Sequence, residues 1–396
     1  MFRIIVLAVL ACGYCPALAV AEQVASKDES QATPRIGVVV ERPQAGRFVK
    51  VPDGFMVPYD QKLPGSKLVI RMQPIPGGAF VLPSKVAGGS ERTVEIQPMW
   101  MAQYEVSWKQ YSEFMSLYRG IKKIARTKSD IGVDSVDAVS APTEIYEPSL
   151  HMPFAESPLQ PATGMTQYGA RQFTKWLSLR SKLQYRLPGE DEWTYACIGG
   201  ESSALAKPIE RAVLERMACF DNLPNGAAIA GSFAANAFGL YDMLGNSAEW
   251  VITQRGHAIT ANWPPVRKQL LDAEEGFGQL ACGGSWMDFP SECQPLSRVV
   301  SSGEWSHGDP NVPLSPYWHA NTEYSATIGF RICRQLKAIP REEMQQYWDA
   351  VSEQVRYDDD IRVAGGRAAR AVITDEIEEA ARLNPVTSHR FWDKKK

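Results

Sequence analysis

Residues 186–196, RLPGEDEWTYA, carry the sharpest local signal in the chain. The Pro-Gly pair inside the stretch predicts a turn that closes a short strand. Glu190, Asp191 and Glu192 then occupy the first turn of a short helix, where the helix dipole favours acidic side chains. The stretch therefore predicts a strand–turn–helix unit.

Two amphipathic helices are expected on the N-terminal side of this unit. The first follows a strand in MWMAQYEVSWKQYSEFM, residues 99–115, with Ser107 as its N-cap. The second runs over residues 166–183, with Thr166 as its cap. Their Met and aromatic side chains recur at helical spacing, which indicates core packing and no cofactor site. Residues 198–336 contain mostly loops, short strands and glycines.

Composition narrows the class of protein. The chain has 396 residues, 44% of them hydrophobic, which is enough for one large domain or two ordinary ones. A net charge of −3 and the lack of a Lys/Arg stripe give no reason to expect a nucleic-acid partner. The 11 Trp and 27 Pro residues indicate irregular structure held together by aromatic packing.

The N-terminus predicts export. Residues 1–21 combine a basic start, an apolar run and small residues for cleavage after Ala19 or Ala21, which is typical of a signal peptide. The alternative is a lipoprotein whose Cys12 is acylated and anchors the chain to a membrane. Both alternatives place the mature chain outside the cytoplasm, periplasmic or secreted. No run is long enough to predict a transmembrane helix.

The remaining chain divides into three regions. Residues 22–67 are expected to form a polar linker and an irregular extension that packs on the main domain. The main domain is expected over residues 68–336 and a helical tail over residues 337–396. In the tail, EEMQQYWDAVSEQV (342–355) and AARAVITDEIEEAARL (368–383) both read as helical.

Several phrases resemble one family when they are taken in order. RLPGEDEWTYA, NAFGLYDMLGNSAEWV (236–251), a Gly-Gly-Ser-Trp turn and IGFRICR (328–334) resemble signatures of the formylglycine-generating enzyme, or sulfatase-modifying factor, family. MWMAQYEVSWKQYSEFM and PATGMTQYGARQFTKWL (161–177) resemble its two N-terminal helices. The resemblance implies an α+β fold of the compact C-type-lectin-like kind, with much irregular structure and bound calcium. The helical C-terminal tail lies outside it.

A calcium site can be argued in the phrase YDMLGNSAEWV. Asp242 and Glu249 supply hard oxygen ligands, and Gly245 permits a tight turn whose backbone carbonyls face inward. By itself this pattern also fits a solvated turn with a capping Asp and a surface Glu. The resemblance implies calcium ligands at Asp242, at the Gly245 and Ser247 carbonyls, and at Glu249.

The family's second calcium site would fall at Asn222 and Leu223. The loop that follows them is short, and the Asp-Gly-Phe element of the family is not evident there.

The expected active site departs from the family. Active members hold two cysteines five residues apart just after Gly-Gly-Ser, and these thiolates bind Cu(I) while dioxygen oxidises a substrate cysteine to formylglycine. After Gly283–Ser285, the first cysteine position holds Asp288 and the second holds Cys293. A carboxylate is a hard ligand and Cu(I) a soft ion, so we do not expect a Cu(I) site. Ser285 is expected to line the pocket or satisfy the turn.

The cysteines outside the signal segment are odd in number: Cys197, Cys219, Cys282, Cys293 and Cys333. In an oxidising compartment disulfides are expected. The resemblance implies a bridge from Cys197 to a strand beyond the active-site loop, which favours Cys197–Cys293. A second bridge, Cys282–Cys333, is expected from strands that should be neighbours, and it would leave Cys219 unpaired.

Three functions remain open. The first is a formylglycine-generating oxidase acting on sulfatases, against which Asp288 counts heavily. The second, which we favour, is a calcium-stabilised binding or scaffolding module that lacks copper chemistry and binds a protein or peptide partner, a sulfatase being one candidate. The third is a divergent oxidoreductase or metal enzyme that uses Asp288 as an acid, a base or a ligand. The histidines lack the spacing of an iron site.

Overall fold

A computed structural model describes residues 36–83, 90–125, 137–142, 155–223, 225–253, 278–306, 315–319 and 325–383. Residues 1–36 and 37–396 separate as two units, and every helix and strand described here belongs to the second. The expected signal peptide, Cys12 and the start of the linker lie outside the described residues.

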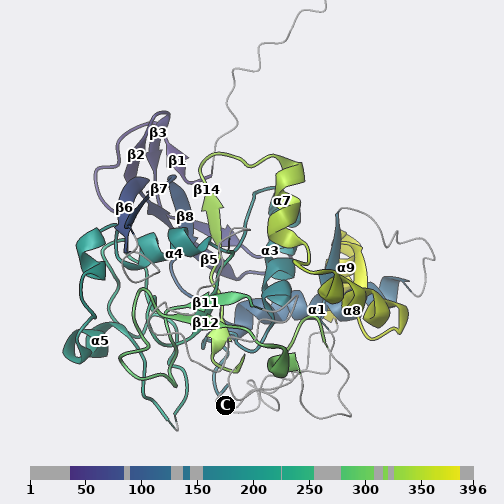
Figure 1. Ribbon diagram of the computed structural model, residues 1–396. Coiled ribbons are helices and arrows are strands. Elements are labelled where there is room, and N and C mark those ends of the chain that lie inside the picture. Colours follow the sequence, from purple (N-terminus) through teal and green to yellow (C-terminus); the bar gives the residue numbers. More distant parts are fainter. Residues whose placement is uncertain are drawn as a thin grey trace, which may run out of the picture. The chain divides into compact units, whose positions relative to one another are not determined.

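The first large sheet has the strand order β14-β8-β5-β4 (Figure 1). Its strands are β4 (Tyr59–Lys62), β5 (Val69–Ile75), β8 (Met99–Ala102) and β14 (Cys333–Gln335). All four residues of β8 are buried, because this apolar strand is central and pairs antiparallel with both neighbours. β4 lies before residue 68, so the sheet begins earlier in the chain than the expected domain boundary.

The second large sheet has the order β12-β11-β10-β13 and carries the expected functional phrases. Its strands are β10 (Ala248–Trp250), β11 (Leu280–Cys282), β12 (Arg298–Val300) and β13 (Ile328–Gly329). β10 pairs antiparallel with β11 and parallel with β13, and β11 pairs antiparallel with β12. The pairing brings the NSAEWV, CGGSW and IGFR phrases into one sheet although they are far apart in the sequence.

Smaller sheets complete the strand pairing in the described ranges. They contain β1 (Val38–Val39), β2 (Val49–Val51), β3 (Gly54–Met56), β6 (Gly78–Leu82), β7 (Arg92–Ile96), β9 (Ala138–Ala141) and β15 (Ala369–Val372). Their orders are β1-β3-β2, β6-β7 and β15-β9. The extension before residue 68 therefore contains a regular antiparallel sheet, which differs from the irregular segment that we expected.

Helices α1 (Trp108–Ala125), α3 (Gln167–Ser181) and α4 (Glu190–Cys197) confirm the three helices expected in the main domain. Thr166 caps α3, because its hydroxyl accepts a hydrogen bond from the Gly169 N–H. The interior faces of α1 and α3 supply aromatic rings that stack on one another, such as Tyr111 on Phe173. A shorter helix, α5 (Arg211–Met217), and the 3₁₀ turns η1 (Ser202–Leu205) and η3 (Gly303–Ser306) lie in the loop-rich half.

The tail contains α7 (Arg341–Trp348), α8 (Glu353–Ala364) and α9 (Asp375–Leu383), so its helical character is confirmed. The stretch Ala369–Val372 is a strand, β15, where we expected helix. β15 pairs with β9 of the main domain, and α9 packs along α1, as Figure 1 shows in yellow beside blue. No helix of the described residues is long and apolar enough to cross a membrane.

Candidate functional site

The Gly-Gly-Ser turn follows β11 directly and depends on its glycines. Gly283 and Gly284 adopt φ angles of 98° and 71°, a region that side chains with a Cβ rarely enter. A Cβ on Gly284 would lie 2.8 Å from the Cys293 Sγ and 2.7 Å from the Glu292 carbonyl oxygen. The backbone of the turn therefore packs closely against the segment that ends at Cys293.

Ser285, Asp288 and Cys293, the three residues expected to line the active site, lie together in this turn. The Ser285 hydroxyl donates to the Asp288 carboxylate over 2.7 Å, and the Cys293 thiol donates to the Ser285 carbonyl over 3.6 Å. All three are buried. Burial first, and then the nearby Asp288 and Glu292 carboxylates, raise the pKa of the Cys293 thiol well above its ordinary value. Ionisation of the Cys293 thiol is therefore disfavoured in this fold.

Glu249, one expected calcium ligand, is already paired. Its carboxylate accepts hydrogen bonds from the Trp193 indole over 2.7 Å and from the Arg331 guanidinium on both oxygens. Arg331 and Glu249 are both essentially inaccessible to solvent. The guanidinium supplies the positive charge that Glu249 requires in the interior, so this carboxylate does not fit the role of a calcium ligand.

Asp242 fits a cation better. One of its oxygens, Oδ2, accepts from the Gly231 N–H over 2.6 Å. The other, Oδ1, is buried and has no hydrogen-bond partner within the described ranges. Burial raises the pKa of Asp242 to about 6, an effect that the Gly231 hydrogen bond and Arg331 only partly oppose. A buried carboxylate oxygen without a partner is a site where a cation would restore the missing interaction.

Glu105 holds the turn between Asp242 and Glu249, a role that the sequence did not suggest. Its carboxylate accepts from the Ser247 N–H and hydroxyl and from the Asn246 amide over 2.8–2.9 Å. Burial and the nearby Asp242 and Glu249 raise the pKa of Glu105 well above its ordinary value. Across the described part of the chain, no group of three or more His, Cys, Asp and Glu side chains is arranged to hold a metal ion.

The residues of the second expected calcium site take other roles. The Asn222 side chain donates to the Gly226 carbonyl over 2.7 Å and accepts from the Asn225 amide over 3.1 Å, so it closes a local turn. Leu223 points its side chain to solvent and is 59% exposed.

The structure forms neither of the expected bridges, since none of Cys197, Cys219, Cys282, Cys293 and Cys333 is in a disulfide. The expectation that Cys282 and Cys333 lie on neighbouring strands is wrong. Cys282 belongs to the β12-β11-β10-β13 sheet, whereas Cys333 stands opposite Met101 in the other large sheet. The Cys197 thiol donates to the Met243 carbonyl, and the Cys293 thiol donates to the Ser285 carbonyl.

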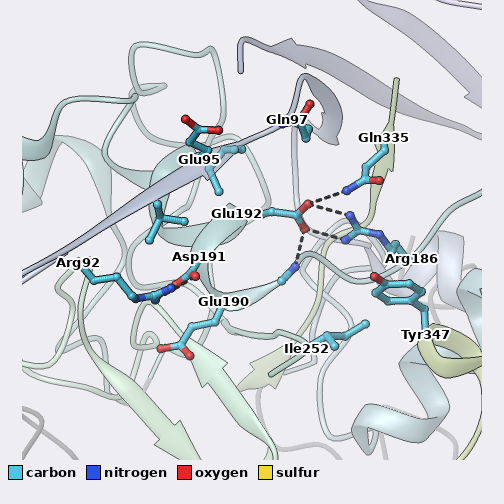
Figure 2. A pocket seen from close by; sticks show the side chains of 13 residues that line it. Arg92, Glu95, Gln97, Arg186, Glu190, Asp191, Glu192, Ile252, Gln335 and Tyr347 are labelled. Carbon is cyan, nitrogen blue, oxygen red and sulfur yellow. Dashed lines mark hydrogen bonds and ion pairs between the residues drawn. The ribbon is translucent and has the colours of Figure 1, made fainter. Parts of the chain in front are cut away.

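A polar pocket of about 220 Å³ lies at the N-terminus of α4, outside the expected active site (Figure 2). It is lined by Arg92, Val94, Glu95, Ile96, Gln97, Arg186, Gly189, Glu190, Asp191, Glu192, Ile252, Gln335 and Tyr347. Inside it, Arg186 forms a two-pronged ion pair with Glu192 over 2.7 Å, and the guanidinium lies over the Tyr347 ring of the tail. The Arg-x₅-Glu spacing within RLPGEDE was visible in the sequence, but the contribution of Tyr347 from α7 was not.

Four apolar side chains are exposed on loop segments of the loop-rich half and just before α3, and we call them the Phe289 patch: Leu159, Leu223, Ile229 and Phe289. Their segments are hydrogen-bonded in two pairs. Asp221 and Asn222 donate to the Asp288 and Trp286 carbonyls over 2.9 Å, and Ala230 donates to the Leu159 carbonyl over 3.3 Å. Phe289 is the most exposed of the four, at 61%. Grouped exposed apolar side chains of this kind are typical of interaction sites.

Among curated proteins, several relatives match part of the chain. Serine/threonine-protein kinase pkn1 of Chlamydia pneumoniae is 36% identical over 141 residues, which is 35% of this chain and 21% of that protein. The Chlamydia caviae protein of the same name is 25% identical over 326 residues, 80% of this chain and 45% of that protein. Formylglycine-generating enzyme of Mycobacterium tuberculosis is 33% identical over 138 residues, 30% of this chain and 46% of that protein. The chain thus spans less than half the length of each of these relatives.

Solved structures similar to this chain include Treponema denticola variable protein 1, with a TM-score of 0.46 and 18% identity, covering 70% of this chain and 100% of that one. PvdO from Pseudomonas aeruginosa has a TM-score of 0.43 and 19% identity, covering 70% and 99%.

The family model for the sulfatase-modifying factor enzyme 1-like domain matches residues 64–336. These residues include the Gly-Gly-Ser turn, Asp242, Glu249 and Arg331. The match covers well over half of the chain and agrees with the ordered phrases in its sequence. The chain therefore belongs to the family of the sulfatase-modifying factor enzyme 1-like domain.

Proposed function

We propose that this chain is a binding or scaffolding member of its family that does not carry out copper-dependent oxidation of cysteine. One observation carries the proposal: the first thiol position holds Asp288, which is hydrogen-bonded to Ser285, and the second holds a buried Cys293 whose ionisation is disfavoured. Cu(I) favours two thiolate ligands, and the first of the two positions holds a carboxylate instead. The loop is preserved as a structure while its metal-binding groups are not.

The Phe289 patch supplies the binding face in this proposal. It lies on the loop segments around Asp288, so a partner bound there would contact the region where active members of the family do their chemistry. Its exposed apolar side chains favour a protein or peptide partner, since burying them against another apolar surface contributes about 25 cal/mol per Å². Several relatives are named as kinases, and the match to them covers less than half of their length, which agrees with a domain used as one module of a larger protein.

The test of the proposal is an anaerobic Cu(I) titration of the purified chain, with an aldehyde assay on a Cys-x-Pro-x-Arg peptide under air. We expect no stoichiometric Cu(I) binding and no aldehyde above a Cys293→Ala control. The matched variant is Asp288→Cys, which restores two cysteines five residues apart and is expected to gain Cu(I) binding. Aldehyde formation by the wild type at a rate well above the Cys293→Ala control would overturn the proposal.

We also propose that calcium binds at Asp242, with the Gly245 and Ser247 carbonyls as further ligands. The unpartnered Asp242 oxygen supports this placement, and Glu249 is not part of the ligand set because Arg331 and Trp193 engage it. The ion would hold the ligands of this turn together and so stabilise the fold, and it would take no part in catalysis. Addition of calcium to chelator-treated protein should raise the Tm of the wild type but not that of Asp242→Asn. An equal Tm with calcium and with chelator would contradict it.

Export is the third part of the proposal, and it is supported by the basic and apolar start of residues 1–21. Fusion of these residues to a reporter that is active only outside the cytoplasm should give reporter activity. Replacement of Cys12 by Ser separates the two alternatives, because only a lipoprotein would lose its membrane fraction.

A further inference from the structure

Cys282 lies on the face of its sheet that α4 covers. In the antiparallel pairs of this sheet, Cys282 stands directly opposite Glu249 of β10 on one side and Arg298 of β12 on the other. Residues directly opposite each other in antiparallel strands present their side chains on the same face. The side chains of Glu249, Cys282 and Arg298 therefore form one row across the sheet.

Helix α4 contacts both ends of this row. The Trp193 indole donates to Glu249 over 2.7 Å, and the Arg298 guanidinium donates to the Thr194 hydroxyl over 2.7 Å. Cys282 lies between these two contacts. Its side chain is therefore directed at the helix.

Cys197 is on the facing side of α4. It follows Trp193 by four residues and Thr194 by three, the spacings that place side chains on one helix face. Its thiol donates to the Met243 carbonyl oxygen, and the same oxygen lies 2.8 Å from the position that a Cβ on Gly283 would take. Gly283 is the residue directly after Cys282. Both thiols are buried, and we infer from these contacts that they face each other between α4 and β11.

We propose that Cys197 and Cys282 form a disulfide when the chain folds in an oxidising compartment. Two S–H bonds break and one S–S bond forms. The two electrons and two protons pass to the disulfide of an oxidant of the glutathione or dithiol-oxidoreductase class, which becomes two thiols. The proposal rests on the export proposed above, because cytoplasmic thiols are kept reduced.

The electrostatic surroundings agree with a pair of neighbouring thiols. Burial first, then the Glu249 carboxylate and, more weakly, the Cys282 thiol raise the pKa of the Cys197 thiol, and the Arg298 and Arg331 guanidinium groups oppose this rise. Buried protonated thiols react slowly, so the bond forms during folding, before α4 closes over the sheet. In the finished fold it fixes α4 to the strand that leads into the Gly-Gly-Ser turn.

The other thiols do not compete for these two. Cys333 lies in the other large sheet and accepts a hydrogen bond from Arg186 over 3.2 Å. Cys293 lies against Gly284 and the Ser285 carbonyl, and the Cys219 thiol donates to the Gly226 carbonyl.

The test is disulfide mapping of the full chain after refolding in a glutathione redox buffer. Free thiols are alkylated before digestion, and linked peptides are identified by mass before and after reduction. We expect a peptide pair joined through Cys197 and Cys282. A link from Cys197 to Cys293, a link from Cys282 to Cys333, or recovery of both Cys197 and Cys282 as alkylated thiols would each overturn the proposal. Because refolding is done in vitro, the result is independent of the export test.

A stability measurement gives a second readout. Chain refolded under oxidising conditions should melt roughly 5 °C or more above chain refolded with reductant, as a bridge that closes a long loop predicts. Cys282→Ala should abolish this difference, whereas the matched control Cys333→Ala should keep it. A difference that survives in Cys282→Ala would count against the bridge, and the mapping of the wild type decides the matter even where a variant does not fold.

Discussion

Glu192 connects the turn before α4 to the first large sheet through one carboxylate. It accepts hydrogen bonds from both Arg186 nitrogens and the Gly189 N–H over 2.7 Å, and from the Gln335 amide over 3.2 Å. Burial alone would raise its pKa, but the Arg186 charge and these hydrogen bonds prevail and lower the pKa of Glu192 to about 2. The ionised form is therefore bound more tightly in the folded protein than in the unfolded chain.

Replacing Glu192 by Gln should destabilise the protein by about 3 kcal/mol at pH 7, because Arg186 is left buried without its counter-charge. A carboxyl group whose pKa is lower in the folded protein than in the unfolded chain stabilises the fold at pH values above its pKa in the unfolded chain. This contribution is lost as the pH falls from about 4.5 toward 2. Urea unfolding at pH 7 and pH 3 should thus show the two proteins converging in acid. The control is Asp191→Asn, whose exposed ion pair with Arg92 is worth less than about 1 kcal/mol. Equal losses in the two variants would contradict this reading.

His319 is a buried imidazole with no hydrogen bond on either nitrogen within the described residues. It packs against the rings of Trp250 and Trp305, with centroids 6.0 Å and 5.2 Å away. Burial lowers the pKa of His319 to about 3, so the folded protein keeps the ring neutral while the unfolded chain takes up a proton below about pH 6.5. Stability from this group is therefore present above pH 6.5 and is lost as the pH falls toward 3.

His319→Phe should remove this acid sensitivity, since Phe does not titrate and can occupy the same aromatic cluster. Between pH 7.5 and pH 5 the wild type should lose about 2 kcal/mol more than the variant. Denaturant titrations at the two pH values measure the difference. His319→Gln is the control that removes the titrating group without restoring the aromatic packing. Its free energy of unfolding should depend on pH as weakly as that of His319→Phe, even if its overall stability is lower. An identical pH slope in all three proteins would show that His319 does not contribute.

At the residue scale, the sequence identified which residues lie at the candidate site better than it identified what each of them contacts. It singled out Ser285, Asp288 and Cys293, and the structure brings them together. It did not reveal that Arg331 neutralises Glu249, because the two are 82 residues apart and meet only through the parallel pairing of β10 with β13. A charge pair between distant segments leaves no local pattern.

At the scale of elements, the contact between α1 and α9 depends on a helical glycine. A Cβ on Gly120 would lie 2.3 Å from the Ile377 carbonyl oxygen and 3.1 Å from the Ala381 nitrogen. Both distances are too short for a side-chain carbon. The glycine lets the backbones of the two helices approach closely, and Ile377 and Ala381 of α9 are buried as a result.

Gly120→Ala should therefore destabilise the protein, although the same change in an exposed helix usually stabilises by up to about 1 kcal/mol. The new methyl group must push α9 away from α1, and we expect a loss of about 2 kcal/mol from the contacts that open. Thermal unfolding and hydrogen exchange of the α9 amides measure the effect. Lys123→Ala, at an exposed position of α1, is the matched control and should be near neutral. A Gly120→Ala protein more stable than the wild type would show that α9 is not closely packed.

Helices were predicted correctly where residues next to one another in the sequence determine them. Thr166 and the acidic turn at Glu190 predicted where α3 and α4 begin, and both helices begin there. The Ala369–Val372 stretch looked helical because Ala and Arg favour helix, but pairing with β9 makes it a strand. Tertiary contacts therefore determine that this stretch is a strand, and nothing in its own sequence indicates that it pairs with β9.

At the scale of the whole chain, the tail belongs to the same packed structure as the family domain. Buried Asp359 of α8 accepts hydrogen bonds from Ser140 of β9 over 2.7 Å and from Tyr168 of α3 over 3.3 Å, and it also bonds Tyr317 and Arg370. The sequence placed the tail outside the family resemblance. The described tail helices cover the chain's own α1 and α3. The family match ended at residue 336 because only the domain shares its phrases.

Asp359→Ala tests whether the tail is integral. Its loss leaves the Arg370 guanidinium and two tyrosine hydroxyls without their shared acceptor in the interior, which should cost about 3 kcal/mol or more. The matched control is the neighbour Asp360, which pairs with the same Arg370 but is exposed, so Asp360→Ala should change stability by less than about 1 kcal/mol. Denaturant unfolding gives both values, and limited proteolysis should show new cleavage between residues 341 and 383 only in Asp359→Ala. If the two variants unfold and are cleaved alike, the tail is a separable appendage, and its helices become available to a partner. If they differ as expected, partner binding must use another surface, for which we propose the Phe289 patch.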